Sequence, residues 1–342
     1  MRAIVVSAIA AGLLTCAAAA RADDQVLPDL GADVVPLDQA PPEADPCSLL
    51  PGDELFGLDW TRRQLFGAVC RSARWFDSFF GEERYDDEAL GIRGRLILGV
   101  EERERVGMTF TPRFSARVPL PNLNERVSLL IERDDEDRTI VGRTDAEQDV
   151  LTPPPSFRDE TTQLALGYLR RNVNLRAGVR LSGGALDAFT RARYREEFLQ
   201  TARTQWLFSQ SLFWRQQEGF GETTTLDFEA KPSVPSLIRW FNAATWSEST
   251  TGLSWVSGVT FYRNIGTGKA FLIEPSLQGQ TDLPVDISSY GGRVAYRQTM
   301  GRSWLIGEAF TGYAWPKFTA GETRHSQFFV GVRVELLFGE QP

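Results

Sequence analysis

From about residue 88 to the C-terminus, hydrophobic and polar residues alternate with a period of two, which is typical of β-strands with one apolar face. The last segment shows this clearly. Its apolar row is Phe328, Val330, Val332, Val334, Leu336 and Phe338, and its other row includes Gln327, Gly331, Arg333 and Glu335. A soluble sandwich would bury the apolar row against a second sheet. A barrel in lipid turns that row outward and encloses the charged row.

About 14 such segments can be counted between residues 88 and 338, and an error of one hairpin would give about 12 or 16. Short turns at 119–122, 171–172, 232–235 and 300–301 alternate with longer connections at 134–160, 279–288 and 317–324. Aromatic residues near the strand ends fit interface girdles: Tyr168, Trp206, Trp214, Trp240, Trp246, Trp255, Tyr262, Tyr313 and Trp315. The pattern predicts an all-β protein, a transmembrane antiparallel up-and-down β-barrel with both termini in the periplasm. A soluble sandwich or propeller is the alternative, although no blade-length repeat is visible.

Between residues 58 and 81 the hydrophobic period becomes helical. The apolar stripe contains Leu65, Phe66, Val69, Cys70, Ala73, Phe76 and Phe80. We expect Asp59 to cap the N-terminus of this short periplasmic amphipathic helix and Gly81 to end it. The helix could plug the lumen, lie at the inner leaflet with Trp60, Trp75 and Phe79 at the interface, or dock a partner. A cap across the periplasmic mouth is a further alternative.

The N-terminus has the features of an export signal. An apolar run from Ala3 to Leu14 follows Arg2, and Ala20-Arg21-Ala22 forms a small-x-small cleavage site, so residues 1–22 are predicted to be a signal peptide. Acylation at Cys16 is the alternative. Residues 23–57 form an acidic, Pro-rich segment, which is predicted to be a periplasmic linker.

An aromatic-terminated last strand together with an export signal resembles the bacterial outer-membrane β-barrel proteins. The resemblance covers the signal peptide and about residues 88 to 338, and it is architectural, so no active site is implied. It implies a Gram-negative outer-membrane location, contact with lipid and lipopolysaccharide, and recognition of the last strand by the barrel-assembly machinery. The sequence departs from the commonest terminal pattern because four residues follow Phe338.

Composition narrows the picture further. The net charge is −8, and only Lys231, Lys269 and Lys317 are lysines, so the basic residues are almost all arginines. No basic stripe lies outside the strands, which argues against a nucleic-acid partner. After cleavage, Cys47 and Cys70 remain in an oxidising compartment, where a disulfide is the expected state and two free thiols the alternative. A metal site or other cofactor is not predicted, because the single histidine, His325, is distant in sequence.

If the apolar rows face lipid, the opposite rows bring charged residues together in the lumen. The predicted pore-lining set is Arg93, Arg95, Arg113, Arg117, Arg176, Arg180, Arg191, Arg193, Arg195, Arg293, Arg297, Glu308, Arg333 and Glu335. An arginine-rich wall favours small anionic solutes, which predicts a porin-like channel. Interlocked ion pairs that fill the lumen, in a structural or envelope-interaction barrel whose helix docks a periplasmic partner, are the alternative.

A hydrolase at the outer rim is a third hypothesis, and it depends on His325. Adjacent residues of a strand point to opposite faces, so His325 and Ser326 cannot form one dyad. We therefore do not predict an enzyme, and we assign no catalytic residue.

Overall fold

The computed structural model describes Cys47 and residues 57–77, 91–120, 123, 126–135, 160–182, 184–250, 252–282 and 284–339. One helix, α1 (Gly57–Asp77), precedes 14 strands in this part of the chain. The strands are β1 (Arg93–Arg103), β2 (Gly107–Pro119), β3 (Val127–Asp135), β4 (Glu160–Arg170), β5 (Val173–Ser182), β6 (Ala185–Phe198), β7 (Thr204–Arg215), β8 (Gly219–Ser233), β9 (Ser236–Ser247), β10 (Ser254–Gly266), β11 (Lys269–Gln280), β12 (Ile287–Thr299), β13 (Leu305–Pro316) and β14 (Gln327–Gly339). The predicted signal peptide and most of the predicted linker lie outside the described residues.

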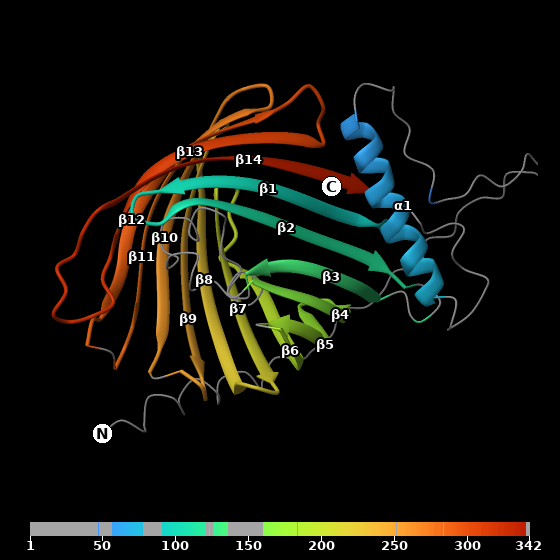
Figure 1. The fold of residues 1–342 in the computed structure, drawn as a ribbon, viewed down its shortest axis with the longest axis horizontal. Coiled ribbons are helices and arrows are strands. Elements are labelled where there is room, and N and C mark those ends of the chain that lie inside the picture. The colour runs from blue at the N-terminus through green and yellow to red at the C-terminus, as the bar shows by residue number, and fades with distance from the viewer. Residues whose placement is uncertain are drawn as a thin grey trace, which may run out of the picture. The chain divides into compact units, whose positions relative to one another are not determined.

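The strands form a closed antiparallel barrel in which each strand pairs with its neighbours in sequence (Figure 1). β1 pairs with β14 from Arg93 opposite Gly339 to Arg103 opposite Phe329, and this seam closes the barrel. The predicted fold class and the count of 14 strands are confirmed. Closure matters in a membrane because it leaves no unpaired strand edge exposed to hydrocarbon.

Exposed apolar side chains occupy one face of the strands, which we call the outer face. Leu98 of β1 lies opposite Val334 of β14, and both are exposed. Aromatic residues cluster near the rims: Phe198, Trp206, Phe228 and Trp240 at one rim and Tyr290, Tyr313, Trp315 and Phe328 at the other. Tyr262 was wrongly assigned to a girdle. It pairs with Leu237 and Leu272 on the inner face, because Phe261 before it faces outward and adjacent residues of a strand face opposite sides.

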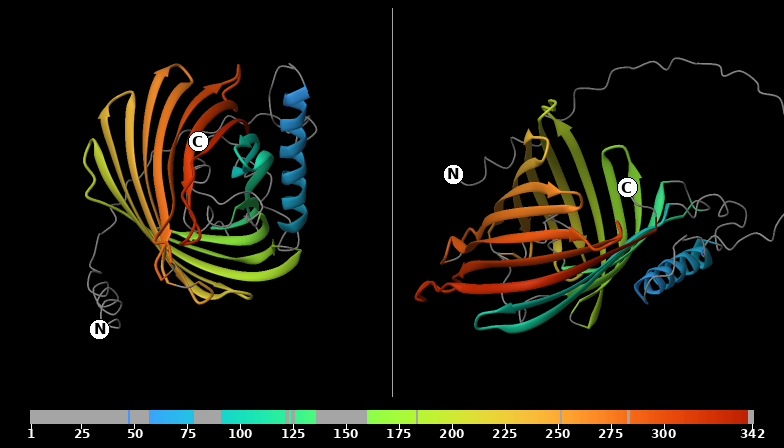
Figure 2. Two further views of the ribbon diagram at one scale, coloured as in Figure 1. Left: turned by 60° about the vertical axis from the view of Figure 1, so that its left-hand side comes forward. Right: turned by 90° about the horizontal axis from the view of Figure 1, so that it is seen from above.

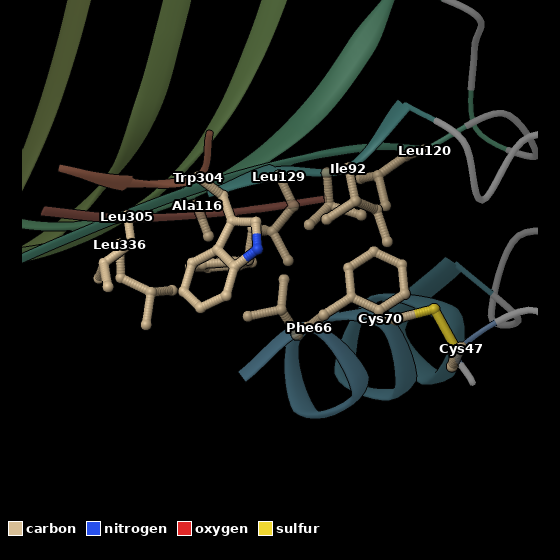
Figure 3. Packing of buried hydrophobic residues seen from close by; sticks show 13 residues of the cluster. Cys47, Phe66, Cys70, Ile92, Ala116, Leu120, Leu129, Trp304, Leu305 and Leu336 are labelled. Atoms are coloured by element: carbon tan, nitrogen blue, oxygen red, sulfur yellow. A yellow bond between two sulfur atoms is a disulfide. The ribbon is translucent and has the colours of Figure 1, made fainter. Parts of the chain in front are cut away.

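Helix α1 packs against the outer face of the barrel at the end where β1 begins and β14 ends (Figure 2). Phe66, Val69 and Cys70 of the helix meet a row of outward side chains, and Figure 3 shows Phe66 directed towards them. The covered residues from the wall include Ala116, Val118, Leu129, Leu305, Leu336 and Phe338. These residues would otherwise face lipid near the periplasmic rim.

Polar contacts also hold the helix in this position. The Arg62 Nε donates to the carbonyl oxygen of Leu337 at 3.1 Å, and the Arg62 guanidinium lies 5.1 Å from the centre of the Trp304 ring. Asp59 lies 3.8 Å from Arg302. The helix therefore crosses the β1–β14 seam from outside, and it neither fills the lumen nor closes the periplasmic mouth.

One sequence-based detail of the helix is corrected. α1 begins at Gly57, so Asp59 is in its first turn rather than at the cap, where its charge still favours the helix dipole. The predicted stop at Gly81 lies outside the described residues. The predicted disulfide is confirmed: Cys47 and Cys70 are bonded, with a Cα–Cα distance of 5.5 Å. Among the described residues, no helix is both long and apolar enough to cross a membrane.

A glycine allows close approach at the seam. Gly94 of β1 lies opposite Phe338 of β14, and a Cβ atom at Gly94 would come within 1.9 Å of the Phe338 ring. The ring therefore lies over the glycine backbone, under α1, and joins the first strand, the last strand and the helix.

Candidate functional site: the lumenal arginines

The strand register places all 14 predicted pore-lining residues on the face opposite the exposed apolar rows, which we call the inner face. They are not equivalent there. Those on β12, β13 and β14 interlock with carboxylates, whereas five arginines on β1, β2, β5 and β6 form a cluster: Arg93, Arg117, Arg176, Arg191 and Arg193.

An ion-pair network runs along the inner face from β11 to β1. Arg293 contacts Glu274 at 2.6 Å and Glu308 at 3.2 Å, and Arg333 lies 3.5 Å from Glu308. The side chains of these four residues are at most 7% exposed. Glu335 extends the network from Arg297 to Arg95. Direct cross-strand pairing explains the geometry, since Arg293 lies opposite Glu274 and Glu308 lies opposite Arg333.

Phenylalanines on the inner face were missed in the sequence. Phe213, Phe241, Phe310 and Phe329 are buried in an apolar cluster on strands β7, β9, β13 and β14. Each lies under a guanidinium group: Arg215 is 4.5 Å from the Phe213 ring centre, Arg103 is 4.5 Å from Phe329, and both Arg293 and Arg333 cover Phe310. The sequence could have placed Phe329 inward. It lies two residues from Gly331 and four from Arg333, so it shares their face of the strand.

The arginine cluster consists of Arg93, Arg117, Arg176, Arg191 and Arg193 around Glu132. Arg176 NH1 lies 3.3 Å from the Glu132 carboxylate, which also accepts from Gln163 Nε2 at 2.5 Å. Arg117, Arg191 and Arg193 each interact electrostatically with both Arg176 and Glu132. Hydroxyls hold two of the side chains, because Arg117 Nε donates to Ser128 Oγ at 3.2 Å and Arg193 Nε to Ser211 Oγ at 2.9 Å. Several cations therefore share one carboxylate.

A cavity of about 270 Å³ opens beside this cluster at the end where β1 begins. Its polar lining includes Arg93, Arg95, Arg117, Arg176 and Glu132. Arg95 is 38% exposed and Arg176 19%, so these guanidinium groups remain accessible to a solute. The Nε of Arg176 is buried and has no hydrogen-bond partner among the residues that the structure describes. Such an arrangement can hold an anion by charge-assisted hydrogen bonds.

A separate polar cluster occupies the opposite, external end of the inner face. Arg180 contacts Asp187 and Glu218, both at 2.6 Å, and Arg215 also pairs with Glu218. Burial raises the pKa of Glu218, but hydrogen bonds and charge from Arg180 and Arg215 outweigh that effect and hold the pKa below its ordinary value. This cluster ties the β7–β8 turn to β5 and β6.

The rim histidine has a simple local role. His325 Nε2 and Thr323 Oγ1 are 3.0 Å apart in the connection between β13 and β14. Thr323 is therefore the hydrogen-bond partner of His325 in the described part of the chain. Within the same residues, no group of His, Cys, Asp and Glu is arranged to hold a metal ion.

The closed barrel, its apolar outer face with aromatic rims and its charged inner face define this chain as a bacterial outer-membrane β-barrel protein. Its apolar outer face fits contact with membrane lipid.

No protein-family model matches the sequence, and a search of curated proteins finds no match either. Among solved structures the chain is similar to outer-membrane expressed OmpT of Vibrio cholerae (11% identity, TM-score 0.42, covering 72% of this chain and 97% of that one). It is also similar to a bacterial polysaccharide outer membrane secretin (7%, 0.43, covering 72% and 98%) and to the KdgM porin (9%, 0.34, covering 70% and 97%).

Proposed function

We propose that this barrel is an outer-membrane channel that passes small anionic solutes. The observation that carries the proposal is the arginine cluster, in which Arg117, Arg176, Arg191 and Arg193 share the Glu132 carboxylate. Fixed cations along a water-accessible wall raise the local concentration of anions and lower the barrier to their passage.

The contrast between the two parts of the inner face supports this proposal. On β11 to β14 the guanidinium groups are neutralised by Glu274, Glu308 and Glu335 or stacked on phenylalanines. That part holds the wall together, whereas Arg93, Arg117, Arg176, Arg191 and Arg193 gather around Glu132 beside the 270 Å³ cavity. Solutes would therefore pass along the β2–β6 side.

Planar-bilayer recordings test the proposal. Under a KCl gradient the wild-type channel should show stable unitary steps and a reversal potential on the anion-selective side. Combining Arg117→Gln, Arg176→Gln and Arg193→Gln should lower the anion-to-cation permeability ratio several-fold. Arg203→Gln, which alters an exposed residue of the β6–β7 turn, is the matched control and should leave the ratio unchanged. Cation selectivity of the wild type would overturn the anionic assignment.

A structural barrel without conductance is the second candidate, and the buried network around Glu308 favours it because such pairs can brace the lumen. In that case α1 would present its exposed face, where Trp60 is 60% exposed, to a periplasmic partner. The absence of unitary steps from correctly folded protein would select this candidate over the channel.

We also propose that the barrel-assembly machinery recognises β14. Phe338 is 1% exposed beneath α1 in the folded protein, so recognition of this aromatic would precede docking of the helix.

A further inference from the structure

A large apolar groove lies on the outer face of β3 to β9, away from the region covered by α1. Its volume is about 730 Å³, within the range of pockets that bind small ligands. The outward side chains that form it include Val127, Leu166, Leu175, Ala192, Leu212 and Trp214. These six side chains face outward by strand parity, and the lining also includes Arg176 and Arg191 of the arginine cluster, which are adjacent in sequence to Leu175 and Ala192.

Small residues make the floor of the groove and large ones make its sides. Ala192 of β6 lies between Leu175 of β5 and Leu212 of β7, and Ala177 is the next outward position after Leu175. A linear hydrocarbon chain fits this shape better than a globular partner does.

The two ends of the groove differ in charge. On β4 the outward row continues from Leu166 and Tyr168, which line the groove, to the exposed Arg170 at the periplasmic rim, and Arg171 follows in the turn. At the external end the groove contains the carboxylate of Glu222. A phosphate group is therefore favoured at the periplasmic end and disfavoured at the external end.

We propose that this groove binds a glycerophospholipid of the periplasmic leaflet. An acyl chain lies along Leu166, Ala192 and Leu212, and the phosphodiester contacts Arg170 and Arg171. The bilayer supplies this ligand directly, since the outer face of a closed barrel meets hydrocarbon between its two rims.

Native mass spectrometry of detergent-purified protein with added phosphatidylglycerol tests the proposal. The wild type should retain one phospholipid, and Ala192→Phe, which fills the floor, should lower its occupancy about tenfold. Ala309→Phe is the matched control, because Ala309 is an exposed outward alanine on β13, remote from the groove. Arg170→Gln combined with Arg171→Gln changes only the rim, leaves the barrel wall intact, and should weaken phosphatidylglycerol retention several-fold.

If Ala192→Phe and Ala309→Phe retained phospholipid equally, the proposal would be overturned. It would also be overturned if the protein retained lipopolysaccharide in place of phospholipid. A wild-type dimer that Ala192→Phe dissociates would identify the groove as an interface between copies of this chain and would also overturn it. The conductance proposal is judged separately, because it depends on inner-face residues that these variants leave unchanged.

Discussion

At the scale of single residues, Glu308 lies among three arginines of the ion-pair network. Its two carboxylate oxygens meet Arg293, Arg333 and Arg297 at 3.2, 3.5 and 3.8 Å. Because Glu308 and the first two arginines are almost fully buried, their charges are weakly screened. The stability of this wall therefore depends on Glu308, whose negative charge offsets the positive charge of these arginines.

Replacing Glu308 with Gln should destabilise the barrel by about 3 kcal/mol at neutral pH, the low end of the range for breaking a buried ion pair. The arginines keep hydrogen-bonding partners but lose a negative charge. Urea unfolding of protein refolded into lipid vesicles measures the change. Glu322→Gln, in an exposed connection, is the control and should stay within about 0.5 kcal/mol of the wild type. An equally small effect of Glu308→Gln would show that the network adds nothing to stability.

The second residue-scale prediction concerns pH and Glu218. Its pKa is lower in the folded protein than in the unfolded chain, where it is about 4.3. Its stabilising contribution is therefore fully present above about pH 4.3 and is lost as the pH falls through the folded pKa. The stability difference between wild type and Glu218→Gln should be constant from about pH 6 to 8 and should shrink below about pH 4. Unfolding midpoints across this range test the sign, and a difference that grew in acid would contradict it.

At the scale of elements, α1 is held by a packed face and by a covalent bond. Phe66 and Val69 pack on the outer wall, Arg62 bonds the β14 backbone, and Cys70 ties the helix to Cys47. The Cys47–Cys70 bond restricts the chain before the helix, so undocking must also work against that restriction.

Changing both cysteines to serine should weaken docking of α1. On the loop-entropy model a disulfide across this separation contributes about 3 kcal/mol, which corresponds to roughly a 100-fold loss of hydrogen-exchange protection in residues 57–77. Protection of β6 to β9 should not change. Phe66→Ala with the disulfide intact is the companion variant, since it removes packing alone. Unchanged hydrogen-exchange protection in the double serine variant would show that packing alone keeps α1 docked.

At the scale of the whole molecule, α1 and the lumen are on opposite faces of the same wall. The β1–β14 pairing closes the barrel without any contribution from the helix. Passage through the lumen and attachment of the helix should therefore be independent.

Deleting residues 44–81 should leave a closed barrel with the same unitary conductance as the full chain, because lipid can cover the outer face that α1 leaves. Heat-modifiable gel mobility reports closure, and bilayer recordings report conductance. A several-fold increase in conductance after deletion would mean that the N-terminal segment obstructs the pore.

The alternation along the chain was enough to predict the barrel, its strand number and which residues share a face, because side-chain direction in a strand depends only on local parity. Helical spacing predicted α1, and two cysteines in an oxidising compartment predicted the Cys47–Cys70 bond. The alternation did not reveal the apolar residues on the inner face. Phe310 and Phe329 are buried there under Arg293, Arg333 and Arg103.

Contacts between distant strands could not be derived in this way. Whether Arg176 meets Glu132 or another carboxylate depends on the register of three strands at once, and a shift of two residues would preserve parity but change the partner. The side of the wall that α1 covers and the groove between β3 and β9 depend on how closure curves the sheet. Local pattern decides the face of each side chain, whereas closure of the barrel decides its neighbours.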